Sequence, residues 1–296
     1  MWLSFLLLLQ VPLVLLENIS TSDQFPEPTY SHLSAYLVSL RTRKYIHTPG
    51  DNHFCTGVIL TSRHVLTSAH CITDKKGMMM NPRRIVVALC AAVFKSPEPE
   101  EFLVEIQSMV IYPYYNRNKQ DDIAVIKLKR TIKFDGYHLA KAVIGNASLE
   151  VGNDCKTVGG NFGIRRQRFG SFHNMLFVNV ELRPFADCQN AKKDLGESVK
   201  DNADLICVKS LEHLVCATDF GGPLFCDGQL YGIALGTVNC SSADPVFFSD
   251  VSFYTSWMKK MISQGVELRP HHKWIFAFAF LTCILGNFHL RQQVDI

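Results

Sequence analysis

The chain has 296 residues, enough for one large domain or two small ones, and its 47% hydrophobic and 19% charged content excludes a largely disordered protein. Its formal net charge of +3 is too small to indicate a nucleic acid or another strongly anionic partner. Composition and charge therefore predict a packed globular protein and leave its function to the motifs.

The start of the chain predicts secretion. Residues 1–16 form a short apolar run, followed at once by polar residues, as in a cleavable signal peptide. A buried strand or a signal anchor are the alternatives, but the first lacks turn signals and the second lacks flanking basic residues. Residues 17–28 read as an extended leader because Pro26 and Pro28 disfavour a helix.

The cysteines and the glycosylation triplets agree with export. Ten cysteines in a secreted chain predict disulfide bonds. The chain contains no C-x-x-C pair and no other zinc-ligand spacing, so the cysteines do not predict a metal site. No cofactor motif is present either. Sequons occur at Asn18, Asn146 and Asn239.

Short apolar or alternating runs recur along the middle of the chain, separated by turn-like stretches. They read AYLVSL, HFCTGVIL, RIVVAL, FLVEIQSMVIY, DIAVIKL, MLFVNVEL and QLYGIAL. Many short strands with almost no long helical period predict an all-β sandwich or a pair of barrels. The one predicted helix comes late, where Phe253, Trp257 and Met261 share a face and Gly265 ends it.

Residues 266–296 differ in composition and form a separate tail. Apolar or small residues run from Trp274 to Gly286, which is short for a bilayer core of roughly 30 Å, although two tolerated polar residues would extend the run to Leu290. A membrane span over residues 274–290, a lipid-anchor signal and a helix packed on the domain all remain open. Of these, we favour membrane association of the precursor.

Three stretches resemble the trypsin/chymotrypsin family of serine proteases, in that family's chain order. They are VLTSAHC ending at Cys71, DDIAVIKL from Asp121 and DFGGPLFC from Asp219. The resemblance covers roughly residues 29–262 of a predicted domain of residues 29–265, and it implies two six-stranded antiparallel β-barrels with a C-terminal helix. It places His70 as the catalytic base and Asp122 as the aspartate that orients it.

The same resemblance implies that the catalytic machinery is incomplete. Where the family has G-D-S-G-G-P this chain has T-D-F-G-G-P, so Phe220 stands at the nucleophile position without a hydroxyl for the histidine to deprotonate. Thr218 replaces the glycine of the oxyanion hole, and Leu214 replaces the aspartate at the base of the specificity pocket of trypsins. No activation sequence like I-V-G-G precedes the domain, so Asp219 lacks its usual cation and should find another partner or show a raised pKa.

The resemblance also implies the disulfide pairs. They are Cys55 with Cys71, Cys155 with Cys226, Cys188 with Cys207, and Cys216 with Cys240. Cys90 and Cys283 are left over, as buried thiols or as partners in an intermolecular bond.

The leading functional hypothesis is a secreted, catalytically inactive homologue that binds a protein partner, whether a protease, a substrate or an inhibitor. The wording of GDNHFCTGVIL and LTSAHC looks most like insect members of the family, whose inactive homologues act as cofactors or decoys in extracellular proteolytic cascades. One rival is a hydrolase that uses another hydroxyl, such as Ser241, Ser242 or Thr218. Another is a binding module tethered to a membrane by the tail.

Overall fold

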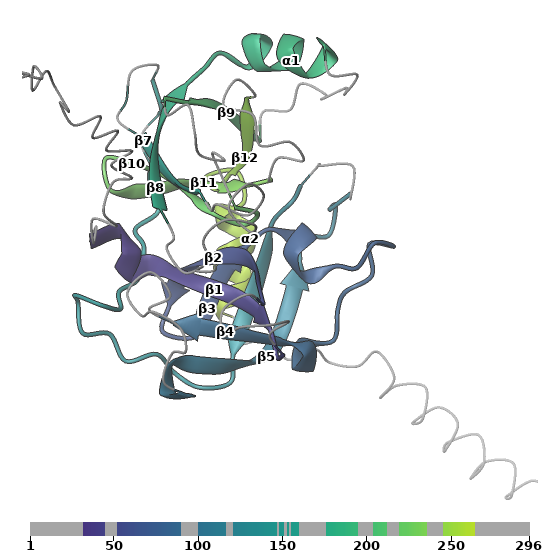
Figure 1. The fold of residues 1–296 in the computed structure, drawn as a ribbon, viewed down its shortest axis with the longest axis vertical. Coiled ribbons are helices and arrows are strands. Elements are labelled where there is room, and N and C mark those ends of the chain that lie inside the picture. The colour runs from purple at the N-terminus through teal and green to yellow at the C-terminus, as the bar shows by residue number, and fades with distance from the viewer. Residues whose placement is uncertain are drawn as a thin grey trace, which may run out of the picture.

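In the computed structural model the chain forms an all-β domain of two halves. The described residues are 32–44, 52–89, 100–116, 121–146, 148–150, 153, 155–159, 176–194, 204–211, 219–235 and 245–263. Their strands form two closed barrels of six strands each, as predicted from the resemblance (Figure 1). The predicted signal peptide, leader and tail lie outside the described residues.

The first barrel is the lower one in Figure 1, coloured from purple to light blue. Its strands are β1 (Leu37–Thr42), β2 (His53–Thr61), β3 (His64–Thr67), β4 (Ile85–Leu89), β5 (Leu103–Ile111) and β6 (Ala124–Leu128). All neighbours pair antiparallel in the order β1-β2-β3-β6-β5-β4, and β1 closes the barrel against β4. Aliphatic and β-branched residues dominate these strands, and alternate side chains pack on opposite faces: Val38 and Leu40 of β1 lie in the core of the first barrel, whereas Leu37 lies in the cluster shared with the second.

The second barrel lies above the first in Figure 1, in teal to yellow-green. Its strands are β7 (Cys155–Gly159), β8 (Leu176–Leu182), β9 (Leu205–Ser210), β10 (Pro223–Cys226), β11 (Gln229–Ala234) and β12 (Val246–Asp250). They close in the order β10-β11-β12-β9-β8-β7. The described helical segments are η1 (His32–Tyr36), η2 (Ala69–Ile72), η3 (Pro82–Arg84), η4 (Glu100–Phe102), α1 (Phe185–Asp194) and α2 (Thr255–Ser263).

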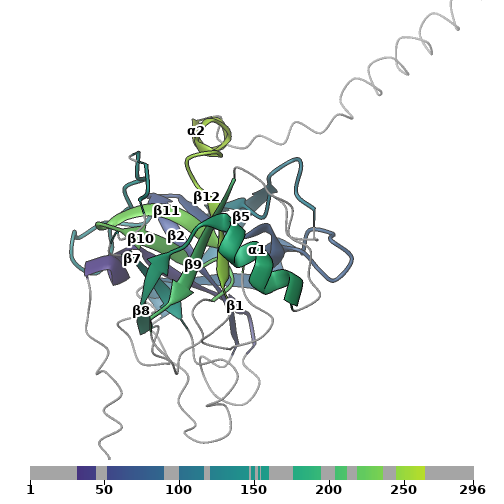
Figure 2. The same ribbon diagram turned by 90° about the horizontal axis from the view of Figure 1, so that it is seen from above.

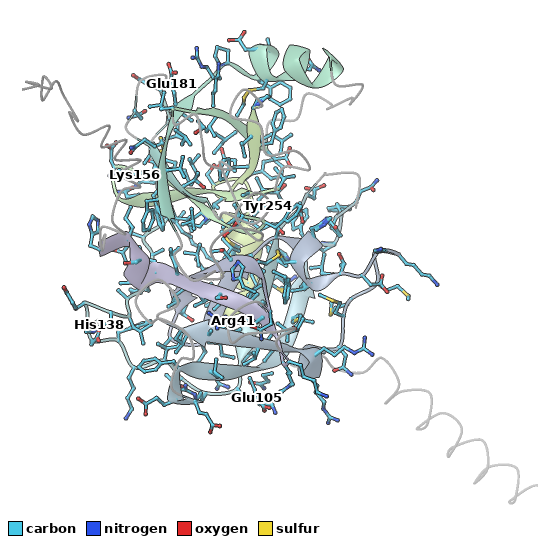
Figure 3. All side chains as sticks on the ribbon, viewed as in Figure 1. Arg41, Glu105, His138, Lys156, Glu181 and Tyr254 are labelled. Carbon is cyan, nitrogen blue, oxygen red and sulfur yellow. A yellow bond between two sulfur atoms is a disulfide. The ribbon has the colours of Figure 1, made fainter. Side chains whose placement is uncertain are left out.

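A shared hydrophobic core joins the barrels. Leu66 and Ile123 from the first barrel pack in one cluster with Phe225 and Ile233 from the second, and all four are at most 1% exposed. Tyr254, also in this cluster, lies where the two barrels meet (Figure 3). Burying a side chain of this kind contributes roughly 1.5 to 3 kcal/mol, so the core holds the barrels in one fixed arrangement. That arrangement positions the residues between them.

The late helix differs in detail from the prediction. The structure places α2 from Thr255 to Ser263, after a turn in which Tyr254 N–H donates to the Val251 carbonyl. Phe253, predicted on its buried face, lies in that turn and is 56% exposed, whereas Met258 is the fully buried residue of the helix. We attribute the difference to the neighbouring Tyr254, which is buried in the shared core and thereby sets which face of α2 packs against the domain. Figure 2 shows α2 at the edge of the domain.

The helix α1 was not predicted from the sequence. Its sequence, FADCQNAKKD, has few apolar residues and therefore no amphipathic stripe. Its position is set instead by Cys188, which is bonded to Cys207 of β9.

Candidate functional site

His70 sits in η2, directly after β3. Ser68 precedes this short helix in an extended conformation, and Cys71 within it is bonded to Cys55 of β2. The disulfide and the strand hold both ends of the segment, so the position of the histidine follows from the first barrel alone.

Asp122 lies just before β6 and is 2% exposed. Its Oδ1 accepts a hydrogen bond of 2.7 Å from the backbone N–H of His70. From the second barrel, Ser249 Oγ donates to the Asp122 carbonyl over 3.3 Å. The structure therefore brings together the histidine and the aspartate that the sequence predicted, and it fixes the aspartate from both barrels.

Phe220 completes this arrangement on the turn before β10. Its ring stacks on the imidazole of His70, with 4.7 Å between ring centroids and 11° between the planes. Phe220 also packs against the core of the first barrel. A hydrocarbon ring thus fills the space beside the face of the histidine, and the residue at this position offers it no hydroxyl.

Main-chain hydrogen bonds hold the turn of Phe220. The Phe220 carbonyl accepts from Thr56 N–H of the first barrel over 2.9 Å, and Gly221 N–H donates to the Ala234 carbonyl of the second over 3.0 Å. Gly221 has φ +72°, and a Cβ there would come within 2.3 Å of Thr67 Oγ1 and 2.4 Å of the Thr56 carbonyl oxygen. Only glycine satisfies both demands, so the turn keeps its shape whatever residue precedes it.

Asp219 is 6% exposed and has polar partners of its own. Its Oδ2 lies 3.6 Å from His53 Nε2 and 3.4 Å from Thr56 Oγ1, which donates to it. His53 Nδ1 is 2.5 Å from Ser39 Oγ, and that oxygen accepts from Arg41 Nε over 2.9 Å. We expected this buried carboxylate either to find another partner or to show a raised pKa, and in the structure it has His53 and Thr56 as partners.

Sequence reasoning missed this chain of polar side chains from Arg41 to Asp219. A sequence signal for His53 was present. His53 stands two positions before Cys55 in the same strand, so the two side chains lie on the same face of β2. Ser39 and Arg41 alternate on β1 in the same way. The contact of these two side chains with His53 depends on the register between β1 and β2, in which Ser39 pairs with Thr56 and Arg41 with His53. Neither segment alone predicts that register.

Three disulfide bonds occur in the described residues, at Cys55–Cys71, Cys155–Cys226 and Cys188–Cys207. These are three of the four pairs that the resemblance implied. Cys216 and Cys240 of the fourth pair lie outside the described residues, as do Cys90 and Cys283.

Several other predicted residues also fall outside the described part of the chain. They are Leu214, Thr218, Ser241, Ser242, Asn18 and Asn239. Asn146 is described and exposed, as a glycosylation acceptor must be. Within the described ranges, His, Cys, Asp and Glu side chains form no group that could hold a metal ion. None of the helices described there combines the length and apolar character needed to cross a membrane.

Comparison with known proteins places this geometry in context. The family model described as Trypsin matches residues 25–258. The "Snake venom serine protease homolog rhinocerase 3" of Bitis rhinoceros is 26% identical over 229 residues, covering 75% of this chain and 83% of its own. "Granzyme M" of Rattus norvegicus is 26% identical over 240 residues, covering 79% and 86%.

Solved structures show the same fold at lower identity. The "scabies mite inactivated protease paralogue S-I1" superimposes with a TM-score of 0.62 at 21% identity, covering 79% of this chain and 98% of that one. The "Kallikrein-related peptidase 10 complex with Zn2+" gives 0.57 at 20% identity, covering 79% and 98%. At these identities the structural likeness establishes the fold and nothing finer.

Proposed function

The chain belongs to the trypsin family of serine proteases, and we propose that within this family it is a binding or regulatory protein that does not cleave peptide bonds. The observation that carries the proposal is the stacking of Phe220 on His70. In this family the histidine takes a proton from a serine hydroxyl, whose oxygen then attacks the substrate carbonyl. Phenylalanine has neither the proton nor the lone pair.

The remaining parts of the site do not compensate for that loss. Removing the nucleophile from a serine protease costs about 10⁶ in turnover, because the catalytic groups work as a unit. Here the ring also fills the space beside the imidazole, where a substrate carbonyl would have to approach. His70 and Asp122 therefore support the shape of the site without a reaction to perform.

The state of Asp219 supports the same conclusion. Active family members pair the corresponding aspartate with a new amino terminus, and the sequence offers no activation motif to supply one. In the structure His53 and Thr56 face this carboxylate instead. The predicted defects at Leu214 and Thr218 would add to these two.

The names of the relatives are compatible with an inactive member. The snake venom relative is called a serine protease homolog, and the mite structure an inactivated protease paralogue. The mite structure shares the fold with this chain, and neither name identifies what this chain binds. The likeness to insect members remains a prediction from the wording of the motifs.

We place this protein outside the cell, in contact with a protease, a substrate or an inhibitor as its protein partner. The predicted signal peptide, the disulfide bonds and the exposed sequon at Asn146 support secretion. A role as cofactor or decoy in an extracellular proteolytic cascade follows from a protease-shaped surface without catalysis. Attachment to a membrane through residues 274–290 is the alternative, and fractionation of expressing cells with and without residues 271–296 separates the two.

The direct test treats protein purified from culture medium with a fluorophosphonate probe and with arginyl, aromatic and small-residue peptide substrates. We expect neither labelling nor hydrolysis, with active trypsin as the positive control. Stoichiometric labelling that persists in the His70→Ala variant would point to another nucleophile and contradict the proposal. Labelling abolished by that variant would contradict it as well, because it would show a working histidine-dependent site.

A further inference from the structure

Two neighbouring methionines are exposed on the loop that follows the histidine segment. Met78 is 59% exposed and Met79 is 47% exposed. We call residues 74–84 the basic methionine loop, because Lys75, Lys76, Arg83 and Arg84 are exposed on it too. In Figure 1 this loop leaves the right-hand side of the first barrel, between η2 and η3.

The loop is held in a defined shape by its own hydrogen bonds. Asp74 Oδ1 accepts from the backbone N–H groups of Lys76 and Met78, over 2.8 and 3.0 Å, and Asp74 N–H donates to the Met78 carbonyl over 2.8 Å. Met80 N–H donates to the Ile72 carbonyl, and the Met80 side chain packs against the barrel core. At the far end Asn81 Oδ1 caps η3 by accepting from Arg83 N–H.

This internal bonding separates the three methionines by role. Met80 anchors the loop against the barrel core, whereas Met78 and Met79 are exposed to solvent. Exposing two large apolar side chains together costs hydrophobic free energy, and an unbranched thioether adapts its shape to whatever packs on it. The pair is therefore suited to contact with another molecule.

The four basic side chains of the loop form no ion pair with any residue that the structure describes. The acid at the base of the loop, Glu105, is bound by Arg43 and Lys129, whose hydrogen bonds hold its pKa at about 2. Figure 3 shows Glu105 on the outer side of the first barrel.

The loop also lies next to the candidate site. Its first residue follows His70 by four positions, and Thr73 Oγ1 lies 3.5 Å from Tyr115 OH of the segment after β5. Tyr114 in that segment is 76% exposed. A polypeptide bound beside His70 would therefore meet this surface.

We infer that the basic methionine loop binds an acidic segment of a partner protein that also carries apolar side chains. The inference rests on the proposed binding function and names the chemistry of its partner. The cations supply complementarity to carboxylates, and the methionines supply an apolar contact that a sulfated glycan would not use. A lipid surface is less suitable, because only two apolar side chains are offered and a stable anchor needs more.

The test measures binding of the full secreted protein to two fluorescein-labelled synthetic peptides, one built from the repeat Glu-Glu-Leu and the other from Glu-Glu-Ser. Replacing the four basic residues (K75Q, K76Q, R83Q and R84Q) should weaken both peptides about tenfold, because each exposed charge contributes little alone. The variant M78S/M79S should weaken only the Leu peptide, by about threefold to tenfold. The control K133Q/K141Q removes two other exposed cations and should stay within about twofold.

The outcomes distinguish this inference from the function on which it rests. Equal binding by the wild-type protein and the four-residue variant overturns the loop as the site, whatever the probe and substrate assays show. Dependence on the cations without dependence on the methionines, together with tighter binding of heparin or of phosphatidylserine vesicles, overturns the acidic segment as the ligand. Fluorophosphonate labelling contradicts the proposed function and leaves the peptide result standing.

Discussion

The histidine side of the site and the turn of Phe220 are held by different kinds of contact. On the histidine side a side chain makes the connection, because the Asp122 carboxylate accepts a hydrogen bond from the His70 backbone N–H. On the turn the main chain makes the connections, through Thr56, Gly221 and Ala234. The difference indicates that the side chain at position 220 can change while the main chain of the turn stays, whereas loss of the Asp122 carboxylate should weaken the histidine side.

The largest expected effect is at Gly221, where the main-chain connections are tightest. Gly221→Ala should destabilise the protein by more than about 3 kcal/mol, because it combines a strained φ of +72° with overlap against Thr67 and the Thr56 carbonyl. Gly136→Ala is the matched control, since Gly136 has φ +76° with nothing within 4 Å of the added Cβ. It should cost about 1 to 2 kcal/mol. Equal losses in urea denaturation would show that packing at the turn is unimportant.

Asp122 tests the histidine side. Asp122→Ala should cost about 2 kcal/mol, because it removes the buried acceptor of the partly buried His70 N–H. Asp122→Asn keeps an oxygen at that position and should cost about 1 kcal/mol. An alanine variant as stable as wild type would show that the carboxylate has no structural role, and would contradict the contrast between the histidine side and the turn of Phe220.

Phe220→Ser tests the turn and should have a smaller effect on stability. Phe220 is partly buried, so the loss should be about 1 to 2 kcal/mol, against less than about 1 kcal/mol for the exposed control Phe134→Ser. Peptidase activity should stay absent, because Leu214, Thr218 and the missing activation sequence are separate defects. A trypsin-like rate from this single change would show that the oxyanion hole and the pocket are intact.

The smallest expected effect concerns Asp121, the neighbour of Asp122 that faces the second barrel. Burial raises its pKa, and so does the nearby Asp204, while Tyr254 OH donates to its Oδ1 over 3.1 Å. A raised carboxyl pKa contributes stability below the ordinary value of 3.8, and this contribution is lost as the pH rises through the raised pKa. Asp121→Asn should therefore raise stability at pH 7 by less than about 1 kcal/mol and flatten the pH dependence above pH 4.

Asp227→Asn is the control for that variant. Asp121 and Asp227 both have positive φ, 53° and 49°, a conformation that asparagine tolerates well. Asp227 is exposed, so its replacement carries the backbone effect without the burial. If both variants show the same pH profile, burial of Asp121 is not the cause.

Sequence patterns predicted the parts of the fold that depend on local chemistry. The apolar runs of β2, β4, β5 and β6 were found within a few residues, because alternating or aliphatic segments favour strands wherever they pack. The strand-like runs did not include β3, β7, β9, β10 or β12, and the polar helix α1 was missed too, since such short or polar segments carry no period that can be recognised. The family motifs supplied the two closed barrels, which depend on pairings between distant strands.

The candidate site was predictable to a similar depth. The motifs named His70, Asp122 and Phe220, and the structure places all three together. The stacking geometry was not predictable, because it depends on how the turn of Phe220 is fixed to the first barrel. The contact between His53 and Asp219 was missed for the same reason: it depends on how the turn before β10 packs against β2 of the first barrel, which neither segment specifies alone.

The bonds between the barrels also have a consequence for the order of folding events. Thr56 and Asp219 are 163 positions apart, and Ser249 and Asp122 are 127 apart. Closing loops of that length costs entropy that only a collapsed barrel can offset, so we expect these bonds to form last. Changes at such late contacts mainly accelerate unfolding and leave the rate of folding almost unaltered. These contacts between the barrels would then set the lifetime of the native state, independently of any chemistry between the barrels.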